Sequence, residues 1–105
     1  MAIQEISVDE LETLLCGGAR LIDVRELAEF EEVRVAQATL IPLGTVPAHL
    51  DAFRGEGPAY VICRSGGRSM RACEFLAGNG IEAINVAGGT SAWVMSGRNV
   101  ATGAA

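Results

Sequence analysis

Cys63 stands where a thiol could serve as a nucleophile. It is the last residue of the apolar run AYVIC, and Gly66 and Gly67 follow it just before a segment with a helical pattern. In open α/β sheets, ligands bind beyond the carboxyl ends of the strands, so a cysteine that ends such a strand lies at the functional edge of the sheet. The two glycines can adopt backbone angles that turn successive amide N–H groups inward, and the resulting concave cradle binds anions.

The same cradle would favour a thiolate at Cys63. Amide N–H groups, the dipole of the following helix and the nearby Arg64 and Arg68 all stabilise negative charge, and comparable settings lower a cysteine pKa from ~8.5 to roughly 3.5–7.5. Cys63 is therefore predicted to be nucleophilic at neutral pH. The alternative is a small hydrophobic residue that ends a strand, followed by glycines that only make a tight turn. The composition of the loop favours the nucleophile.

The other cysteines, Cys16 and Cys73, give no sign of a disulfide framework. Three is an odd number of cysteines and their spacing fits no zinc site, so we expect a reducing compartment, no structural metal and no cofactor. Cys73 lies about six helical positions beyond Gly67, and ~9 Å along a helix axis is too far for a relaxed disulfide with Cys63. We predict that Cys73 packs in the core, and we assign no role to Cys16 or to the single histidine, His49.

Strands that alternate with helices must position this loop. The apolar runs RLIDV, TLIPL, PAYVIC and EAINVA are predicted strands. Ser7 and Glu10 have capping-box spacing at the start of a predicted helix, Val8–Cys16. Four further helices are predicted over residues 28–32, 46–53, 67–77 and 90–96. This order is typical of an α/β domain whose mostly parallel sheet is covered by helices on both faces.

The composition predicts one globular domain. The chain has 105 residues, of which 50% are hydrophobic and 20% charged. We therefore expect a single domain over residues 1–105, with its core in residues 3–100 and a frayed small-residue tail at 101–105. A net charge of -5 disfavours binding to nucleic acid or to an anionic membrane. There is no basic leader and no long apolar run, so a soluble cytoplasmic protein is expected.

Three segments together resemble the rhodanese family. They are LIDVRELAEF, then IPL, then VICRSGGRSMRACEFLAGNGIEAINVAGGTSAW with SGRNV after it, and the similarity in order and spacing covers about residues 3–100. The resemblance implies the three-layer rhodanese-like fold, a five-stranded parallel sheet flanked by helices, with a persulfide-forming cysteine at Cys63. It implies an active-site loop from Cys63 to Arg68, and the substrate-binding residues are then Arg64, Ser65, Gly66, Gly67, Arg68 and Ser69.

The resemblance also implies a function. The protein would move sulfane sulfur from a small anionic donor such as thiosulfate, or from a persulfide, to a cyanide or thiol acceptor, which could be a protein thiol. This chemistry needs a thiolate to attack the donor, a cation to bind it, and amide donors for the charged outer sulfur.

Two alternatives stay open. One is a carrier or interaction domain without useful turnover, since it needs the same thiolate and loop. The other is a cysteine phosphatase or arsenate reductase, which also combines a thiolate with an anion-binding loop that ends in arginine. Phosphatases that resemble this fold have one residue more between the cysteine and the arginine, so the size of the loop separates them from sulfurtransferases.

One segment departs from the family pattern. Where the family usually has Gly-His-Ile-Pro-Gly-Ala, this chain has VRVAQA at residues 33–38, with Arg34 in place of the usual histidine. The segment supplies no catalytic atom in the family mapping, so a reshaped region there should affect the choice of substrate more than the class of reaction.

Four other residues are predicted to be structural. Asp23, Arg25 and Glu29, in DVRELAEF, follow a predicted strand and are interpreted as a capped turn held by ion pairs. Trp93 follows the Gly-Gly turn of AGGTSAW and is predicted to pack in the core.

Overall fold

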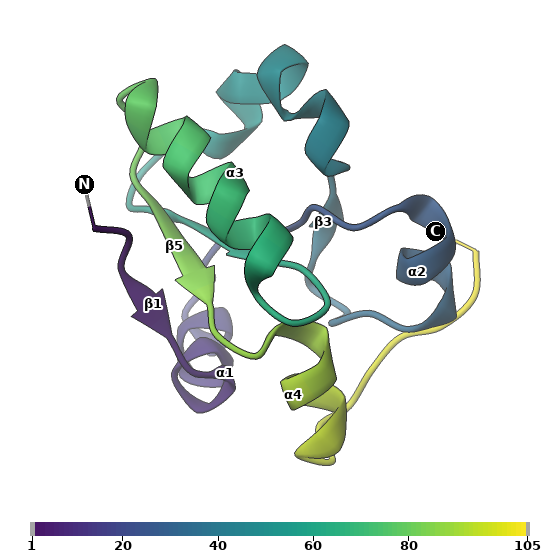
Figure 1. The fold of residues 1–105 in the computed structure, drawn as a ribbon. Helices are drawn as coiled ribbons and strands as arrows, with labels where there is room; N and C mark the ends of the chain where they lie inside the picture. Colours follow the sequence, from purple (N-terminus) through teal and green to yellow (C-terminus); the bar gives the residue numbers. More distant parts are fainter. Residues whose placement is uncertain (1, 105) are drawn as a thin grey trace.

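A five-stranded parallel sheet forms the middle layer of the computed structural model, which describes residues 2–104 (Figure 1). The strand order is β1-β5-β4-β2-β3. The strands are β1 (Glu5–Ile6), β2 (Leu21–Asp23), β3 (Thr39–Leu40), β4 (Ala59–Ile62) and β5 (Ala83–Val86). The helices are α1 (Val8–Cys16), α2 (Leu27–Glu32), the 3-10 helix η1 (Leu43–Phe53), α3 (Gly67–Gly78) and α4 (Gly89–Met95). The predicted α/β architecture is confirmed.

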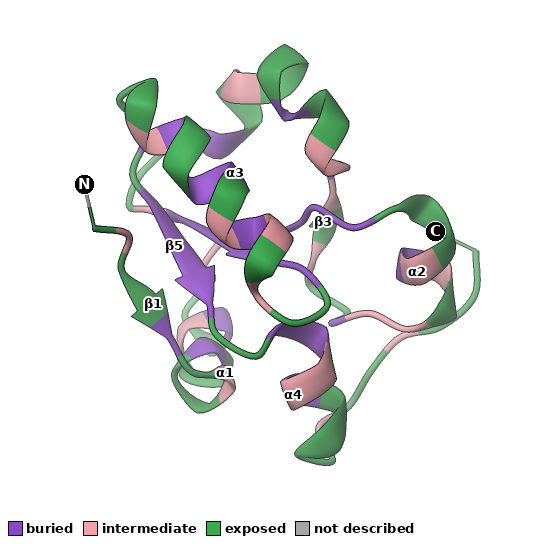
Figure 2. Ribbon diagram, viewed as in Figure 1, coloured by how far each residue is buried: buried purple, intermediate pink, exposed green. Residues whose placement is uncertain are grey.

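Helices cover both faces of the sheet, because alternate side chains of each strand point to opposite sides. Ala59 and Val61 of β4 join the apolar cluster beneath α3 and η1, whereas Tyr60 and Ile62 join the cluster beneath α1 and α4. Figure 2 shows the strand β5 buried and the outer sides of the helices exposed. Burial on both faces explains why the strand segments are apolar throughout instead of alternating with polar residues.

The edge strand β1 was not predicted from the apolar patterns. Its two residues, Glu5 and Ile6, pair with Asn85 and Val86 of β5. A strand of two residues at the edge of a sheet is too short to show an alternating pattern. The number of strands was therefore implied only by the resemblance to a family.

The helix boundaries follow local signals closely. The capping box of α1 is present, since the Ser7 side chain accepts from the Glu10 N–H and the Glu10 carboxylate accepts from the Ser7 N–H. The segment predicted as a helix over 46–53 is instead the 3-10 helix η1, which begins at Leu43 and has non-helical angles at His49. Pro47 lies inside it and lacks the N–H that a regular α-helix would need.

The C-terminal residues are not frayed, which corrects the prediction for the described part of 101–105. Ala101 and Arg34 exchange two backbone hydrogen bonds of 2.9 Å. Arg34 Nη1 also donates to the Gly103 carbonyl at 2.9 Å, and the Gly103 N–H donates to the Glu31 carbonyl at 2.7 Å. The end of the chain therefore runs beside α2 (Figure 1). Ala105 lies outside the described residues.

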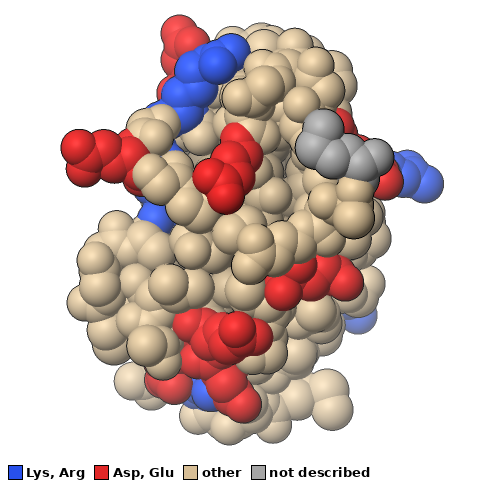
Figure 3. Space-filling model, turned by 90° about the vertical axis from the view of Figure 1, so that its left-hand side faces the viewer, with Lys and Arg blue, Asp and Glu red and all other residues tan. Residues whose placement is uncertain are grey.

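On the face shown in Figure 3, several carboxylates adjoin one another at the lower end, others stand singly, and the arginines that are visible stand apart from one another. None of the helices in residues 2–104 is long and apolar enough to cross a membrane.

Candidate active site

Cys63 lies at the carboxyl end of the central strand β4, in the turn that leads into α3. Gly66 is the N-cap of α3 and has a left-handed conformation, with φ 111 and ψ -13, which glycine adopts without steric cost. The turn therefore folds back over the strand end. The structure brings the predicted loop residues, Cys63 to Ser69, together at this edge of the sheet.

Two groups donate hydrogen bonds to the Cys63 sulfur. The Gly66 N–H lies 3.1 Å from Sγ and the Ser69 hydroxyl 3.2 Å from it. Burial acts to raise the pKa of the Cys63 thiol. The Ser69 hydroxyl and the amides of Ser69, Gly66 and Ser65 outweigh burial, so the pKa is lowered from its ordinary value. The Gly66 amide and the Ser69 hydroxyl at the sulfur therefore favour a thiolate.

Ser69 faces the sulfur directly. Its side chain is fully buried on the first turn of α3, and its hydroxyl donates to Cys63 Sγ. The sequence grouped Ser69 with the substrate-binding residues. Its geometry instead makes it a hydrogen-bond donor to the sulfur.

Arg68 is already paired, in contrast to the expectation that its charge would be free to bind a donor and to stabilise the thiolate. Its guanidinium makes two bonds of 2.8 Å to the two carboxylate oxygens of Glu29 in α2. The hydrogen bond from Arg68 is the main reason that the pKa of Glu29 is lowered to about 2. The ion pair therefore persists at neutral pH and joins α2 to the loop. Neither Arg68 nor Arg64 is among the leading causes of the lowered pKa of Cys63.

Asp23 and Arg25 form the structural ion pair that the sequence predicted. Arg25 is buried, and its guanidinium bonds to both carboxylate oxygens of Asp23, at 2.8 Å for the closest contact. It also donates to the carbonyls of Glu29 at 3.3 Å and Val33 at 2.7 Å, which ties α2 to the end of β2. Glu29 differs from this pair, because its carboxylate binds Arg68. The sequence missed Glu29 as a residue of the site.

A hollow of about 280 Å³ borders the loop between α2 and α4. Arg64 lies exposed beside this hollow and makes no ion pair with any of residues 2–104. Its positive charge is therefore available to an anionic molecule beside the loop. The residues that line the hollow together with Arg64 include Glu32, Val33, Ser91, Val94 and Met95.

Residues 7–96 match the family described as Rhodanese-like domain. The chain belongs to this family. It is 38% identical over 95 residues to "Putative sulfurtransferase YtwF" of Bacillus subtilis, covering 89% of this chain and 92% of that protein. It is 32% identical over 95 residues to "Putative sulfur carrier protein YrkF" of the same organism, covering 88% of this chain and 51% of that protein.

A solved structure shares the fold. The rhodanese-like domain protein of Staphylococcus aureus is 36% identical and superposes with a TM-score of 0.81, covering 87% of this chain and 91% of that chain. The predicted three-layer rhodanese-like fold is confirmed.

Gly89 supports the loop of this rhodanese-like domain from α4, and the sequence did not single it out. The first amides of α4 donate to the loop, from Thr90 N to the Cys63 carbonyl at 2.9 Å and from Ser91 N to the Arg64 carbonyl at 3.0 Å. Gly89 has φ +56, and a Cβ there would lie 2.4 Å from the Cys63 carbonyl oxygen. This close approach of two backbones requires glycine.

Gly89→Ala is expected to lower the free energy of unfolding by about 1–3 kcal/mol or more. The alanine would be strained in the left-handed conformation, and its Cβ would clash with the Cys63 carbonyl oxygen, which is part of the backbone and cannot move freely. The loop should shift as well, so alkylation of Cys63 should change. Denaturant unfolding and iodoacetamide kinetics measure the two effects. Gly78→Ala is the matched control, since a Cβ at Gly78 meets nothing within 4 Å. Equal stability of the two variants would contradict this account of Gly89.

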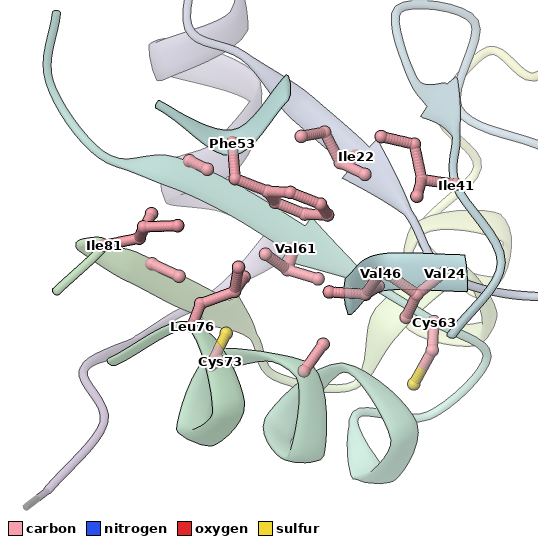
Figure 4. Packing of buried hydrophobic residues seen from close by; sticks show 13 residues of the cluster. Ile22, Val24, Ile41, Val46, Phe53, Val61, Cys63, Cys73, Leu76 and Ile81 are labelled. Atoms are coloured by element: carbon pink, nitrogen blue, oxygen red, sulfur yellow. The ribbon is translucent and has the colours of Figure 1, made fainter. Parts of the chain in front are cut away.

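Cys73 is buried in the core, as predicted. It is fully buried in the cluster beneath α3, and burial raises the pKa of its thiol to about 12. Figure 4 shows its sulfur beside Leu76, apart from that of Cys63 at the start of the helix. Cys16 is a free, exposed thiol. Trp93 is buried in the opposite cluster, also as predicted.

Ser69→Ala is expected to raise the pKa of Cys63 by about one unit or more, because a hydrogen bond to a charged group contributes ~1.5–3 kcal/mol. The pH profile of iodoacetamide alkylation in a Cys16→Ser background measures this pKa. Ser96→Ala is the control, since its hydroxyl bonds to the Trp93 carbonyl, away from the loop. An unshifted profile in Ser69→Ala would mean that the amides alone lower the pKa.

Proposed function

We propose that this rhodanese-like domain is a sulfurtransferase that carries sulfane sulfur on Cys63, from thiosulfate or a persulfide donor to a thiol or cyanide acceptor. The observation that carries the proposal is the Cys63 sulfur, which accepts hydrogen bonds from Gly66 and Ser69 and has a lowered thiol pKa. A thiolate of this kind is the nucleophile that the reaction needs.

The proposed reaction has two steps. The Cys63 thiolate attacks the sulfane sulfur of thiosulfate, the S–S bond of the donor breaks, and sulfite leaves with the electron pair. The product is a Cys63 persulfide whose outer sulfur carries the negative charge. An acceptor thiolate or cyanide then attacks the outer sulfur, the Cys63–sulfur bond breaks, and the thiolate returns.

Each loop residue has a proposed task. The amides of Ser65, Gly66 and Gly67 would hold the outer sulfur, because amide donors aimed at developing charge cost no reorganisation during reaction. Arg64 would bind the anionic donor, since it is the arginine of the loop whose charge is not paired in residues 2–104. Arg68 would set the shape of the loop through its bond to Glu29.

The test is the intact mass of the protein after thiosulfate treatment, with and without dithiothreitol. The treated protein should be heavier by the mass of one sulfur atom, and this added mass, the sulfur adduct, should disappear with reductant. We also propose that the protein works in the cytoplasm, because free cysteines without a disulfide framework are typical of reducing compartments.

A sulfur carrier is the second candidate, and one observation favours it. The sequence is 32% identical to a protein whose name describes it as a sulfur carrier. A carrier should form the adduct once and pass it on only slowly to cyanide or glutathione. Many turnovers with cyanide would exclude this candidate.

A further inference from the structure

Asn85 is a buried polar side chain in an otherwise apolar strand. It lies on β5, is 1% exposed, and has Ile84 and Val86 as buried neighbours. Buried positions of parallel strands are usually apolar, and a polar group there costs stability unless it is hydrogen-bonded. The side chain of Asn85 therefore needs an explanation beyond packing.

The amide nitrogen of Asn85 connects two elements that are distant in sequence. Nδ2 donates to Glu5 Oε2 on the neighbouring strand β1 at 2.8 Å, and to the Gly66 carbonyl in the active-site loop at 3.2 Å. Both partners are acceptors, so only the NH₂ end of the amide can face them. Oδ1 has no partner among residues 2–104. The amide is thus fixed in one orientation although its own oxygen stays unpaired.

Strand pairing does not require this side chain. The backbone already joins β5 to β1, through Asn85 N to the Gln4 carbonyl and Ala87 N to the Ile6 carbonyl, both at 2.9 Å. The two strands lie side by side in Figure 1. What the side chain adds is a bond to the loop.

Gly66 is the loop residue whose orientation matters most to the sulfur. Its N–H donates to Cys63 Sγ, and its carbonyl accepts from Asn85 and from the Met70 N–H at 3.1 Å. Glycine has more accessible backbone angles than any other residue, so neighbouring groups must select the left-handed conformation. A bond to the carbonyl fixes the rotation of this residue and thereby the direction of its N–H.

We propose that Asn85, oriented by Glu5, is a positioning residue that holds Gly66 with its N–H directed at the Cys63 sulfur. This proposal rests on the proposed role of Cys63. It means that the exposed carboxylate of Glu5 and the buried amide of Asn85 both help to stabilise the Cys63 thiolate. Glu5 acts through Asn85, and Asn85 acts through Gly66. None of the three takes part in bond making.

The main variants are Asn85→Asp and Glu5→Ala, both in a Cys16→Ser background so that the remaining thiols are Cys63 and the buried Cys73, whose raised pKa keeps it protonated. Asn85→Asp keeps the shape but replaces the donor by an oxygen that faces two acceptors. Because the new carboxylate can also raise the pKa of Cys63 by its charge, the neutral variant Asn85→Leu, which removes the donor without adding charge, must shift the midpoint as well if Asn85 is a positioning residue. The midpoint of the iodoacetamide pH profile should rise by about 0.5 to 1 pH unit, which is about three- to tenfold slower alkylation below both midpoints. Glu5→Ala should raise it by less, because the bond from Asn85 to Gly66 remains.

The controls separate positioning from stability. Glu5→Gln keeps an acceptor oxygen and should restore the parental midpoint. Asn79→Asp changes an exposed asparagine whose amide bonds to the Phe75 carbonyl, and it should leave the midpoint unchanged. If Asn85→Asp does not fold, Glu5→Ala decides alone, since Glu5 is exposed at the edge of the sheet.

The profile also separates this inference from the proposed function, because alkylation does not depend on sulfur transfer. A shifted midpoint in a protein that transfers no sulfur would support Asn85 as a positioning residue while contradicting the sulfurtransferase. A lower melting temperature with an unshifted midpoint in Asn85→Asp and Glu5→Ala would overturn the inference and leave Asn85 a purely structural residue.

Discussion

Cys63→Ser is expected to abolish both the sulfur adduct and sulfur transfer, whereas Cys73→Ser and Cys16→Ser retain them. A serine hydroxyl cannot form a persulfide, and Cys63 is the cysteine whose thiol pKa is lowered by hydrogen bonds. Burial raises the pKa of Cys73 to about 12, so its thiol stays protonated and protected. The measurement is intact mass after thiosulfate, followed by thiocyanate formation with cyanide.

The cysteine controls need care because Cys73 is fully buried. Serine there places a hydroxyl in an apolar cluster, so Cys73→Ala is a second control that adds no polar atom. Both variants should gain one sulfur atom and lose it with dithiothreitol. If the adduct persists in Cys63→Ser, the nucleophile has been assigned to the wrong residue.

The features that the sequence predicted are those with local causes. The loop from Cys63 to Ser69 is one continuous segment, and its glycines and its place after a buried strand are visible in the chain itself. The capping box of α1 likewise depends on residues three positions apart. Where neighbouring residues determine the geometry, their types and spacing were sufficient.

The features that the sequence missed depend on contacts between distant segments. Glu29 meets Arg68 across 39 positions, and Asn85 meets Glu5 across 80. Gly89 is required to be glycine by the Cys63 carbonyl of another element. Such pairs become visible only when the sheet brings the two segments together. The sequence therefore contains no sign that Arg68, which was expected to bind the donor, is paired with Glu29.

The tail illustrates the same limit. Its small residues carry no side-chain signal, and it is fixed by backbone bonds to Arg34 and Glu31 that no local pattern shows. Arg34 lies in the segment that departs from the family pattern. The arginine that replaces the usual histidine thus has a structural role, since it holds the end of the chain.

The unmodified protein is expected to transfer sulfur from thiosulfate to cyanide and to show no significant hydrolysis of an aryl phosphate. Six residues run from Cys63 to Arg68. Phosphatases that resemble this fold have one residue more, which makes a wider ring of amides. A phosphoryl group needs donors for three outer oxygens with its phosphorus in line with the thiolate, whereas a persulfide needs room for one sulfur.

Two features beside the sulfur agree with the expectation that the ring is narrow. The Gly66 N–H already lies 3.1 Å from the sulfur, and Cys63 is only 1% exposed. The arginine that closes the loop is also paired, since Nη1 and Nη2 of Arg68 each donate to the Glu29 carboxylate, whose negative charge offsets that of the guanidinium. The loop therefore disfavours phosphate both in width and in charge.

Inserting one glycine between Gly66 and Gly67 should widen the ring and move its preference toward phosphate binding, with sulfur transfer reduced. The matched control is a glycine inserted between Gly17 and Gly18, in the exposed turn after α1, where an added residue should change neither activity. Thiocyanate formation and aryl phosphate hydrolysis are measured on the same preparations. Efficient phosphate hydrolysis by the unmodified protein, lost in Cys63→Ser and without thiocyanate formation, would replace the sulfurtransferase by a phosphatase, because the Cys63 thiolate would then attack phosphorus instead of a sulfane sulfur.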